Sequence, residues 1–548
     1  MKNLLFLVIA ILIVSGCGGG DSDNYTIYPN SKRYITIKES NQIEHIKKSS
    51  NTTIKLNVIN KKRIYVVVTS RFDNQYISID SFASTKKSKK PNYKIDNKKY
   101  QTRGFLTPQI VLDYRTKAYN KLKSSKNLTA NKKELKLLPR VTSEDDKESF
   151  YIDVFDSSGA SRTKEINATA RKVIANVDTK YGKKTLVVWV EDDVYNDGSF
   201  FSNGTVTQGM VDNLADMFLA DGKSNDIYDW VTNVYGKEWG DTNNNILIKD
   251  SGYIDILIDD MELDGIAGYF YSKDNFVKSN EPTSNEKIMF YINSRVYTRS
   301  GYTQEENEKE VYTTLAHEFQ HMIHFYQKNV IQGAKVSSET EDPTWLNEML
   351  SEATEDLVAT KIGYKGPRNV DPNDGSAGSR GNDGGRYPDF NRYNTLSLTS
   401  WSNSLKHYSK VSAFGAFLLR NYNGAKVLHD ILYSSKTGYE AIEDATGKDL
   451  KTLLSEWAEA VVLSSEDNLP QDKPAYNFGD FKEAKYNDIT YDLGSINFFN
   501  YDPTPTFKSS ATLNNNANLY YYLGEVVGEA TINITIPKGA DITIISKD

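Results

Sequence analysis

Three residues in one short run could hold and use a metal ion: His317, Glu318 and His321, in the sequence AHEFQHMIHF of this 548-residue chain. Side chains four positions apart on a helix point to the same side, so both imidazole rings can bind one Zn²⁺ while the intervening carboxylate faces a water molecule. Only 6 of the 548 residues are histidine, so chance would produce HExxH on the order of 0.005 times in such a chain. The pattern therefore predicts a hydrolytic zinc site.

A catalytic zinc needs a third protein ligand and an open position for water. Several acids follow the motif along the chain: Glu339, Glu341, Glu348, Glu352 and Glu355. Glu348 lies in the run TWLNEMLSE, whose apolar residues can press a second helix against the first. Glu341 lies in the polar run SSETEDP, which is typical of a turn and holds a ligand less firmly. We expect Glu348 to be the third ligand, with Glu341 as the alternative.

His324 and Gln327, which follow the motif, and Glu352, which follows Glu348, are close enough in sequence to be considered as ligands or as partners of the ligands. His324 faces nearly the same side as His317, and we expect it to line the cleft or pack locally. It stands where the pattern HExxHxxGxxH requires glycine, and Gln327 stands where that pattern has its third histidine, so an all-histidine site is excluded. Glu352, one turn after Glu348, is expected to accept the ring N–H of a zinc-bound histidine; the alternative is a glutamate that faces solvent.

The pairing of AHEFQHMIHF with TWLNEMLSE resembles the glutamate-zincin peptidases, and more narrowly the hyicolysin family of bacterial secreted metallopeptidases. The upstream runs VVWVEDDVYN and AGYFY and the downstream run LTSWSNSLKHYSKVSAFGAFLL are also similar, so the resemblance covers about residues 184–464. It implies a zincin-like fold, one catalytic Zn²⁺, and hydrolysis of peptide bonds in protein or peptide substrates.

The same resemblance implies roles for individual residues. His317, His321 and Glu348 correspond to the zinc ligands, and Glu318 to the general base. The family commonly has glycine after WLNE where this chain has Met349, a difference that removes no ligand.

An oxyanion formed at the substrate carbonyl needs a hydrogen-bond donor besides the metal. His407 and Tyr408, in the run KHYSKVSAF, are the candidates, and the resemblance favours Tyr408. The alternative for both is packing in the cleft wall.

The N-terminus has the pattern of a bacterial lipoprotein signal. Lys2 precedes an apolar run at residues 4–14 and the sequence VSGC, so residues 1–16 predict a signal peptide and Cys17 a lipid-modified first residue. The alternative is an ordinary cleaved signal with an incidental cysteine. Residues 17–24 are rich in Gly, Asp and Ser and predict a flexible tether. We therefore expect an extracytoplasmic protein, lipid-anchored on the bacterial envelope or surface, with no internal disulfide because Cys17 is its single cysteine.

Hydrophobic patterning predicts an α+β fold in three parts. Strand-like sequence dominates an N-terminal domain with a joining region at residues 25–165, and a C-terminal β domain at residues 471–548. A metallopeptidase domain at residues 166–470 lies between them. Within it we expect strands at residues 184–190, 253–259 and 287–292, and helices at residues 208–219, 225–235, 304–327, 343–362, 407–432 and 450–464.

The overall composition bears on which kinds of molecule the protein binds. A net charge of -6 and a pI near 5.8 give no sign of a nucleic-acid partner, and nothing in the sequence indicates the oligomeric state. Asp241, Asn243 and Asn245 alternate as in a Ca²⁺ loop, but an Asn-rich turn explains them better because the glycine and closing glutamate of an EF-hand are missing. The leading hypothesis is a zinc peptidase. A non-catalytic surface adhesin and a hydrolase of non-peptide amides are the alternatives.

Overall fold

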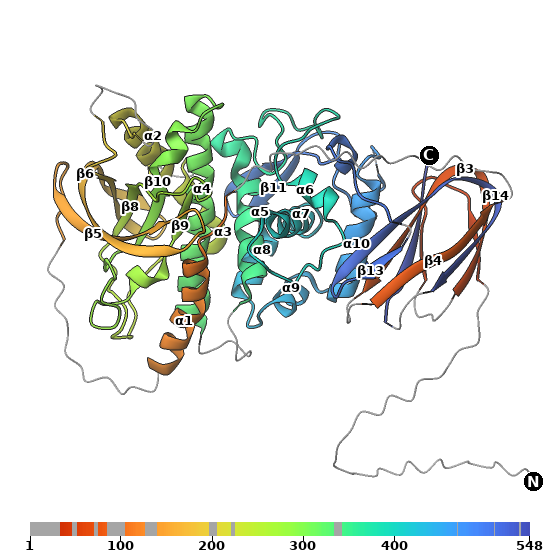
Figure 1. Cartoon of the computed structure of the whole chain (residues 1–548), viewed down its shortest axis with the longest axis horizontal. Coiled ribbons are helices and arrows are strands. Elements are labelled where there is room, and N and C mark those ends of the chain that lie inside the picture. Colours follow the sequence, from red (N-terminus) through yellow and green to blue (C-terminus); the bar gives the residue numbers. More distant parts are fainter. Residues whose placement is uncertain are drawn as a thin grey trace, which may run out of the picture.

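The computed structural model describes residues 33–46, 52–70, 75–84, 105–125, 140–196, 205–220, 225–333, 342–467, 469–508, 510–535 and 539–548, and the structural statements below concern these residues. They form an α+β fold, as expected: a mixed sheet, a helical middle and a β-rich unit follow one another along the long axis of the molecule (Figure 1). The expected signal peptide, Cys17 and the tether lie outside the described residues. Among the described helices, none has both the length and the apolar character needed to span a bilayer.

The mixed sheet has six strands, in the order β5 (Lys147–Phe155), β6 (Ser161–Thr179), β7 (Gly182–Glu191), β8 (Tyr253–Asp259), β10 (Met289–Asn293) and β9 (Gly268–Phe270). The central strands β7, β8 and β10 are parallel, and their continuous apolar runs are buried. Strand β9 pairs antiparallel with β10 and forms one edge. Because β5 and the start of β6 precede residue 166, this sheet extends across the boundary that we expected for the metallopeptidase domain.

The motif helix α4 (Gln304–His324) crosses the molecule beside this sheet (Figure 1). Its start agrees with the sequence, because Thr303 and Glu306 form a capping box that satisfies free backbone N–H groups. The chain then continues as a π-helix (Phe325–Gln332), so helical structure extends beyond the end expected at Gln327. Helices α2 (Gln208–Phe218) and α3 (Ile227–Tyr235) lie between β7 and β8 in the sequence.

The helical middle consists of α5 (Thr344–Ile362), α6 (Tyr387–Arg392), α7 (Leu405–Asn421), α8 (Ala425–Tyr433), α9 (Tyr439–Thr446) and α10 (Leu450–Leu463), followed by a small hairpin of β11 (Lys482–Tyr486) and β12 (Ile489–Leu493). The single helical stretch expected at residues 407–432 is broken, because Asn423 and Gly424 adopt positive φ angles of 57° and 58°. Helix α1 (Gln109–Ser125) is not part of this helical middle; it lies beside the mixed sheet and the end of α4 (Figure 1).

The expectation of two separate terminal β domains is wrong. One seven-stranded sheet combines both ends of the chain, in the order β13 (Ser510–Leu513), β4 (Gln75–Ser84), β14 (Ala517–Thr535), β3 (Thr52–Ser70), β15 (Asp541–Lys547) and β2 (Ile43–Ile46), with β1 (Arg33–Ile37) also on β3. Strand β3 pairs antiparallel with both β14 and β15. Asn518 and Lys547 donate hydrogen bonds to backbone carbonyls of α10, which attaches this sheet to the helical middle. Local sequence predicts strands but not partners more than 400 residues away.

Candidate metal centre

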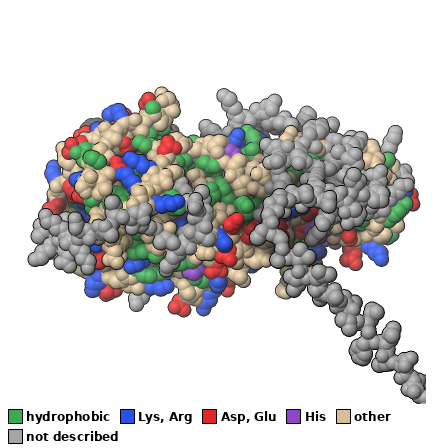
Figure 2. Space-filling view, turned by 90° about the horizontal axis from the view of Figure 1, so that it is seen from below, with side chains coloured by type: hydrophobic (Ala, Val, Ile, Leu, Met, Phe, Trp, Pro, Cys, Tyr) green, Lys and Arg blue, Asp and Glu red, His purple; other side chains and the backbone are tan. Residues whose placement is uncertain are grey.

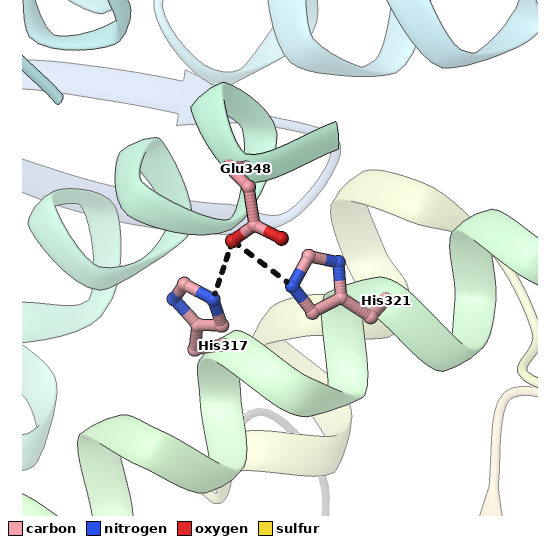
Figure 3. A group of neighbouring side chains, drawn as sticks. All are labelled: His317, His321 and Glu348. Atoms are coloured by element: carbon pink, nitrogen blue, oxygen red, sulfur yellow. Dashed lines mark hydrogen bonds and ion pairs between the residues drawn. The ribbon is translucent and has the colours of Figure 1, made fainter. Parts of the chain in front are cut away.

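Helices α4 and α5 bring the three predicted ligands together. His317 and His321 lie one turn apart on α4, and Glu348 approaches them from the first turns of α5 (Figure 3). Oε2 of Glu348 lies 3.3 Å from Nε2 of His317 and 3.4 Å from Nε2 of His321. All three side chains are buried, so their polar atoms face one another and not bulk water.

The separation of these atoms suits a zinc ion. Zn–N and Zn–O bonds of about 2.0–2.1 Å in a tetrahedral arrangement place neighbouring ligand atoms about 3.4 Å apart. The three ligand atoms lie within 4.8 Å of one another, and two imidazole nitrogens with one carboxylate oxygen are a donor set that zinc commonly uses. The described residues therefore fit a three-ligand site.

Hydrogen bonds on the far side of each imidazole ring favour the metal-binding tautomer. When Nε2 is free to bind a metal, the Nδ1–H of His317 donates to Oε1 of Glu355 at 2.7 Å. The Nδ1–H of His321 donates in the same way to Oδ1 of Asn347 at 2.9 Å. Sequence reasoning assigned neither contact, although Asn347 lies directly before Glu348.

The role expected for Glu352 belongs to Glu355. The buried carboxylate of Glu352 is bound by Arg386, whose Nε and Nη2 donate to it at 2.8 and 2.5 Å. Burial raises the pKa of Glu352 to about 7, while the charge of Arg386 acts in the opposite direction. Residues four and seven positions after Glu348 share a helix face, so spacing alone did not distinguish them.

The charge on Glu348 is maintained by its surroundings. Burial acts to raise its pKa. Attraction to His321 and Arg115, and hydrogen bonds that the Nε2 atoms of both histidines can donate before a metal binds, hold the pKa well below its usual range. Arg115 comes from α1, and its Nη1 donates to Oε1 of Glu348 at 2.8 Å. Glu348 therefore presents Oε2 to the histidines and Oε1 to Arg115.

Glu318 is positioned by the edge strand of the mixed sheet. Its Oε2 accepts a hydrogen bond from the backbone N–H of Phe270 in β9, at 2.8 Å. Burial raises the pKa of Glu318 to about 7, and the negative charge of Glu348 adds to this effect. A buried carboxyl with such a pKa can accept and release a proton near neutral pH.

The two candidates for oxyanion stabilisation differ in position. Tyr408 lines a cavity of about 40 Å³ together with His317 and Glu318. His407 is not among the residues that line this cavity, because its Nδ1 is bonded within residues 402–404. The structure thus brings Tyr408, and not His407, to the site.

The remaining predicted residues have local roles. Nε2 of His324 lies 3.1 Å from Oδ2 of Asp342, and Gln327 donates to the carbonyl of Lys237 at 2.7 Å, which agrees with packing and not metal binding. The alternative ligand Glu341 lies outside the described residues. At the segment expected to be an Asn-rich turn, Oδ1 of Asp241 accepts a hydrogen bond from the backbone N–H of Asp250 at 3.3 Å.

Comparison with known proteins places these features in a family. The Peptidase M30 family pattern matches residues 167–545. The neutral metalloprotease ShpI of Staphylococcus hyicus is 28% identical over 305 residues, which are 54% of this chain and 57% of that protein. The chain therefore spans a little over half the length of this relative.

Solved structures of an M1 zinc metallopeptidase from Deinococcus radiodurans and of a mutant of it are also similar, at 10% and 9% identity. Each alignment covers 57% of this chain and 61% of theirs, with a TM-score of 0.29. The M30 match, in contrast, covers well over half of the chain and confirms the resemblance to hyicolysin-type metallopeptidases. This protein belongs to the Peptidase M30 family.

Proposed function

We propose that this protein is a zinc-dependent peptidase that hydrolyses peptide bonds in proteins or peptides. The observation that carries the proposal is that buried ligand atoms of His317, His321 and Glu348 lie within 4.8 Å of one another, with Oε2 of Glu348 3.3 Å from one ring nitrogen and 3.4 Å from the other. When bound there, zinc would polarise a substrate carbonyl and lower the pKa of a water molecule.

The other residues then have distinct tasks. Glu318 accepts a proton on the oxygen that Phe270 does not hold and returns it to the leaving amine. Tyr408 donates a hydrogen bond to the developing oxyanion. Glu355 and Asn347 hold the imidazole rings in the metal-binding orientation. An intact set of ligands, base and ring partners favours catalysis over the adhesin alternative.

We also propose that the protein is anchored by a lipid on Cys17 and acts outside the cytoplasm, on the strength of the N-terminal pattern alone. On the face shown in Figure 2, acidic and basic side chains of the described residues are interspersed and form no continuous basic stripe of the kind that binds nucleic acid. Metabolic labelling with a fatty-acid analogue tests the anchor: label should enter the natural chain and be lost in Cys17→Ala. Equal labelling of the two would contradict it.

The experiment for catalysis compares Glu318→Gln with the natural chain after zinc loading. We expect both to bind one zinc, and the variant to cleave an internally quenched peptide about 10²–10⁴-fold more slowly, because the proton acceptor is lost. A chelator should abolish cleavage by the natural chain. Glu305→Gln, an exposed change on the same helix, is the matched control and should cleave normally. Full activity of Glu318→Gln would exclude Glu318 as the base.

A further inference from the structure

Residues 105–125, called here the cleft segment, cross the metal centre from one side to the other. This segment consists of an extended stretch at residues 105–108 followed by helix α1. It precedes the region that matches the M30 family, which begins at residue 167. Thr107 contacts the site on the side of His317, and Arg115 contacts it on the side of His321.

On the first side, the segment occupies the proposed oxyanion donor. The hydroxyl of Tyr408 donates to Oγ1 of Thr107 at 3.1 Å and accepts from the N–H of Thr107, also at 3.1 Å. Asn403 donates to the carbonyl of Thr107 at 3.0 Å. The N–H of Leu106 donates to the carbonyl of Gly265, just before the edge strand β9. The backbone N–H and carbonyl of Thr107 are therefore both hydrogen-bonded, as the backbone of an extended peptide ligand would be.

On the second side, the segment occupies a proposed zinc ligand. Arg115 donates to Oε1 of Glu348, and its Nη2 is buried with no hydrogen-bond partner among the described residues. A guanidinium beside this carboxylate neutralises part of the charge that would attract Zn²⁺. Together with His321 and Asn347, Arg115 also lines the small cavity on this side of the site. Its position is therefore better suited to closing the site than to serving a bound substrate.

The rest of α1 holds the segment in place. One face of the helix is buried, through Val111, Leu112, Tyr114, Ala118 and Leu122. Tyr114 donates to Glu281 at 2.7 Å, and Asn244 donates to Ser125 at 2.8 Å. The two cavities that the histidine ligands line are small, about 40 Å³ beside His317 and Tyr408 and about 20 Å³ beside His321 and Asn347, whereas the cavity of about 510 Å³ on the far side of Glu355 and Arg386 is lined by none of the three ligands. Each of the two small cavities accommodates a few water molecules at most and not a peptide.

We propose that the cleft segment is an intramolecular inhibitor: it occupies the substrate path, ties up Tyr408 through Thr107 and covers Glu348 through Arg115. This proposal rests on the proposed function, since it assumes that an extended substrate binds along the same groups. Activity then requires the segment to leave, so that substrate binding and segment docking exclude each other. The apparent affinity for substrate is then the affinity of molecules whose segment has left the site, multiplied by the fraction of such molecules.

The test loosens the segment at its two contacts with the site, with Thr107→Val and Arg115→Met combined in the full chain. Each change keeps an apolar stem of similar size and leaves the buried face of α1 intact. Lys117→Met is the matched control, because it removes a cation from the same helix at an exposed position. Its ion-pair partner among the described residues is Glu281, which keeps its contacts with Tyr114 and Lys121 in this variant. Thr107→Val alone, which does not touch a zinc ligand, is a second variant in case the double variant folds poorly.

The first readout is binding of a tripeptide hydroxamate to zinc-loaded protein, with zinc content measured for each variant. We expect the double variant to bind it at least about tenfold more tightly than the natural chain, because a charge-assisted and a neutral hydrogen bond no longer hold the closed state. Its cleavage of an extended peptide should rise in parallel, and Lys117→Met should match the natural chain. Slower cleavage by the double variant at equal zinc content would overturn the proposal and make Arg115 a positioning residue for Glu348.

The second readout does not depend on turnover. Adding the hydroxamate to the zinc-loaded natural chain should increase hydrogen exchange at the amides of residues 106–118, since the ligand displaces the segment. Binding without any change in exchange would overturn the proposal, as would equal binding to the natural chain and the double variant. A double variant that binds the hydroxamate more tightly yet cleaves nothing would support the inhibitor and contradict the proposed peptidase.

Discussion

The hydrogen bond between His317 and Glu355 allows a direct measurement of how the second helix tunes the metal centre. Removing an acceptor of this kind typically lowers metal affinity 10–100-fold, which corresponds to about 1.4–2.7 kcal/mol. The bond is short, at 2.7 Å, and buried, which favours a large effect. However, Glu355 also lines a cavity of about 510 Å³, from which water can reach the vacated position in Glu355→Ala. We therefore expect a loss of about tenfold in zinc affinity, at the lower end of that range.

A second substitution separates the hydrogen bond from the charge. Glu355→Gln keeps an acceptor for Nδ1 of His317 but removes the carboxylate charge, so its loss of affinity should be smaller than that of Glu355→Ala. Arg386 is expected to keep its hydrogen bonds to Glu352 in both variants, while its longer ion pair with Glu355, at 3.9 Å, is lost. Thr360→Ala, on the same helix but bonded to the hairpin β11–β12, is the control and should bind zinc as the natural chain does.

The assay is competition for zinc with a chromophoric chelator at fixed pH, with circular dichroism to show that each variant is folded. Unchanged affinity in Glu355→Ala would refute the argument that this carboxylate orients the ring. Equal losses in the alanine and glutamine variants would show that charge alone is responsible.

Two further predictions concern stability. Burial lowers the pKa of Lys410 from 10.5 to about 7, so the unfolded chain binds more protons between these values and stability rises with pH across them. Relative to Lys410→Met, the natural chain should gain about 2.5 kcal/mol between pH 7.5 and 9.5 in urea unfolding; parallel pH profiles would contradict this. Deleting residues 510–548 should abolish hydrogen-exchange protection in β3, which loses both β14 and β15, while α4 stays protected. Persistent protection of β3 would indicate an independent N-terminal domain.

The parts of the structure that the sequence predicted are those encoded by short-range patterns. The start of α4 at Gln304 follows from a capping residue and acids in the first turn, and the spacing of His317 and His321 follows from the period of a helix. The parallel strands β7 and β8 were visible as continuous apolar runs. In each case the information lies within about ten residues of the feature itself.

The parts that the sequence did not predict depend on contacts between distant segments. Glu352 and Glu355 lie on one face of α5, and only the position of Arg386 decides which of them is left for His317. The pairing of β3 with β14 joins residues that local patterns assign to separate domains.

The same limit applies to α1, where it affects the functional interpretation. An arginine in a short amphipathic helix is ordinarily read as part of a solvated face, and nothing around residue 115 in the sequence refers to the HExxH run. Yet Arg115 contacts a residue 233 positions away, and that residue is the proposed third zinc ligand. Intact ligands and base therefore predict the capacity for catalysis, whereas the state of the site depends on which other segment of the chain occupies it. Glu348 shows the difference between capacity and state, because its Oε2 faces the histidines as a ligand would, while its Oε1 is bound by Arg115 of the cleft segment.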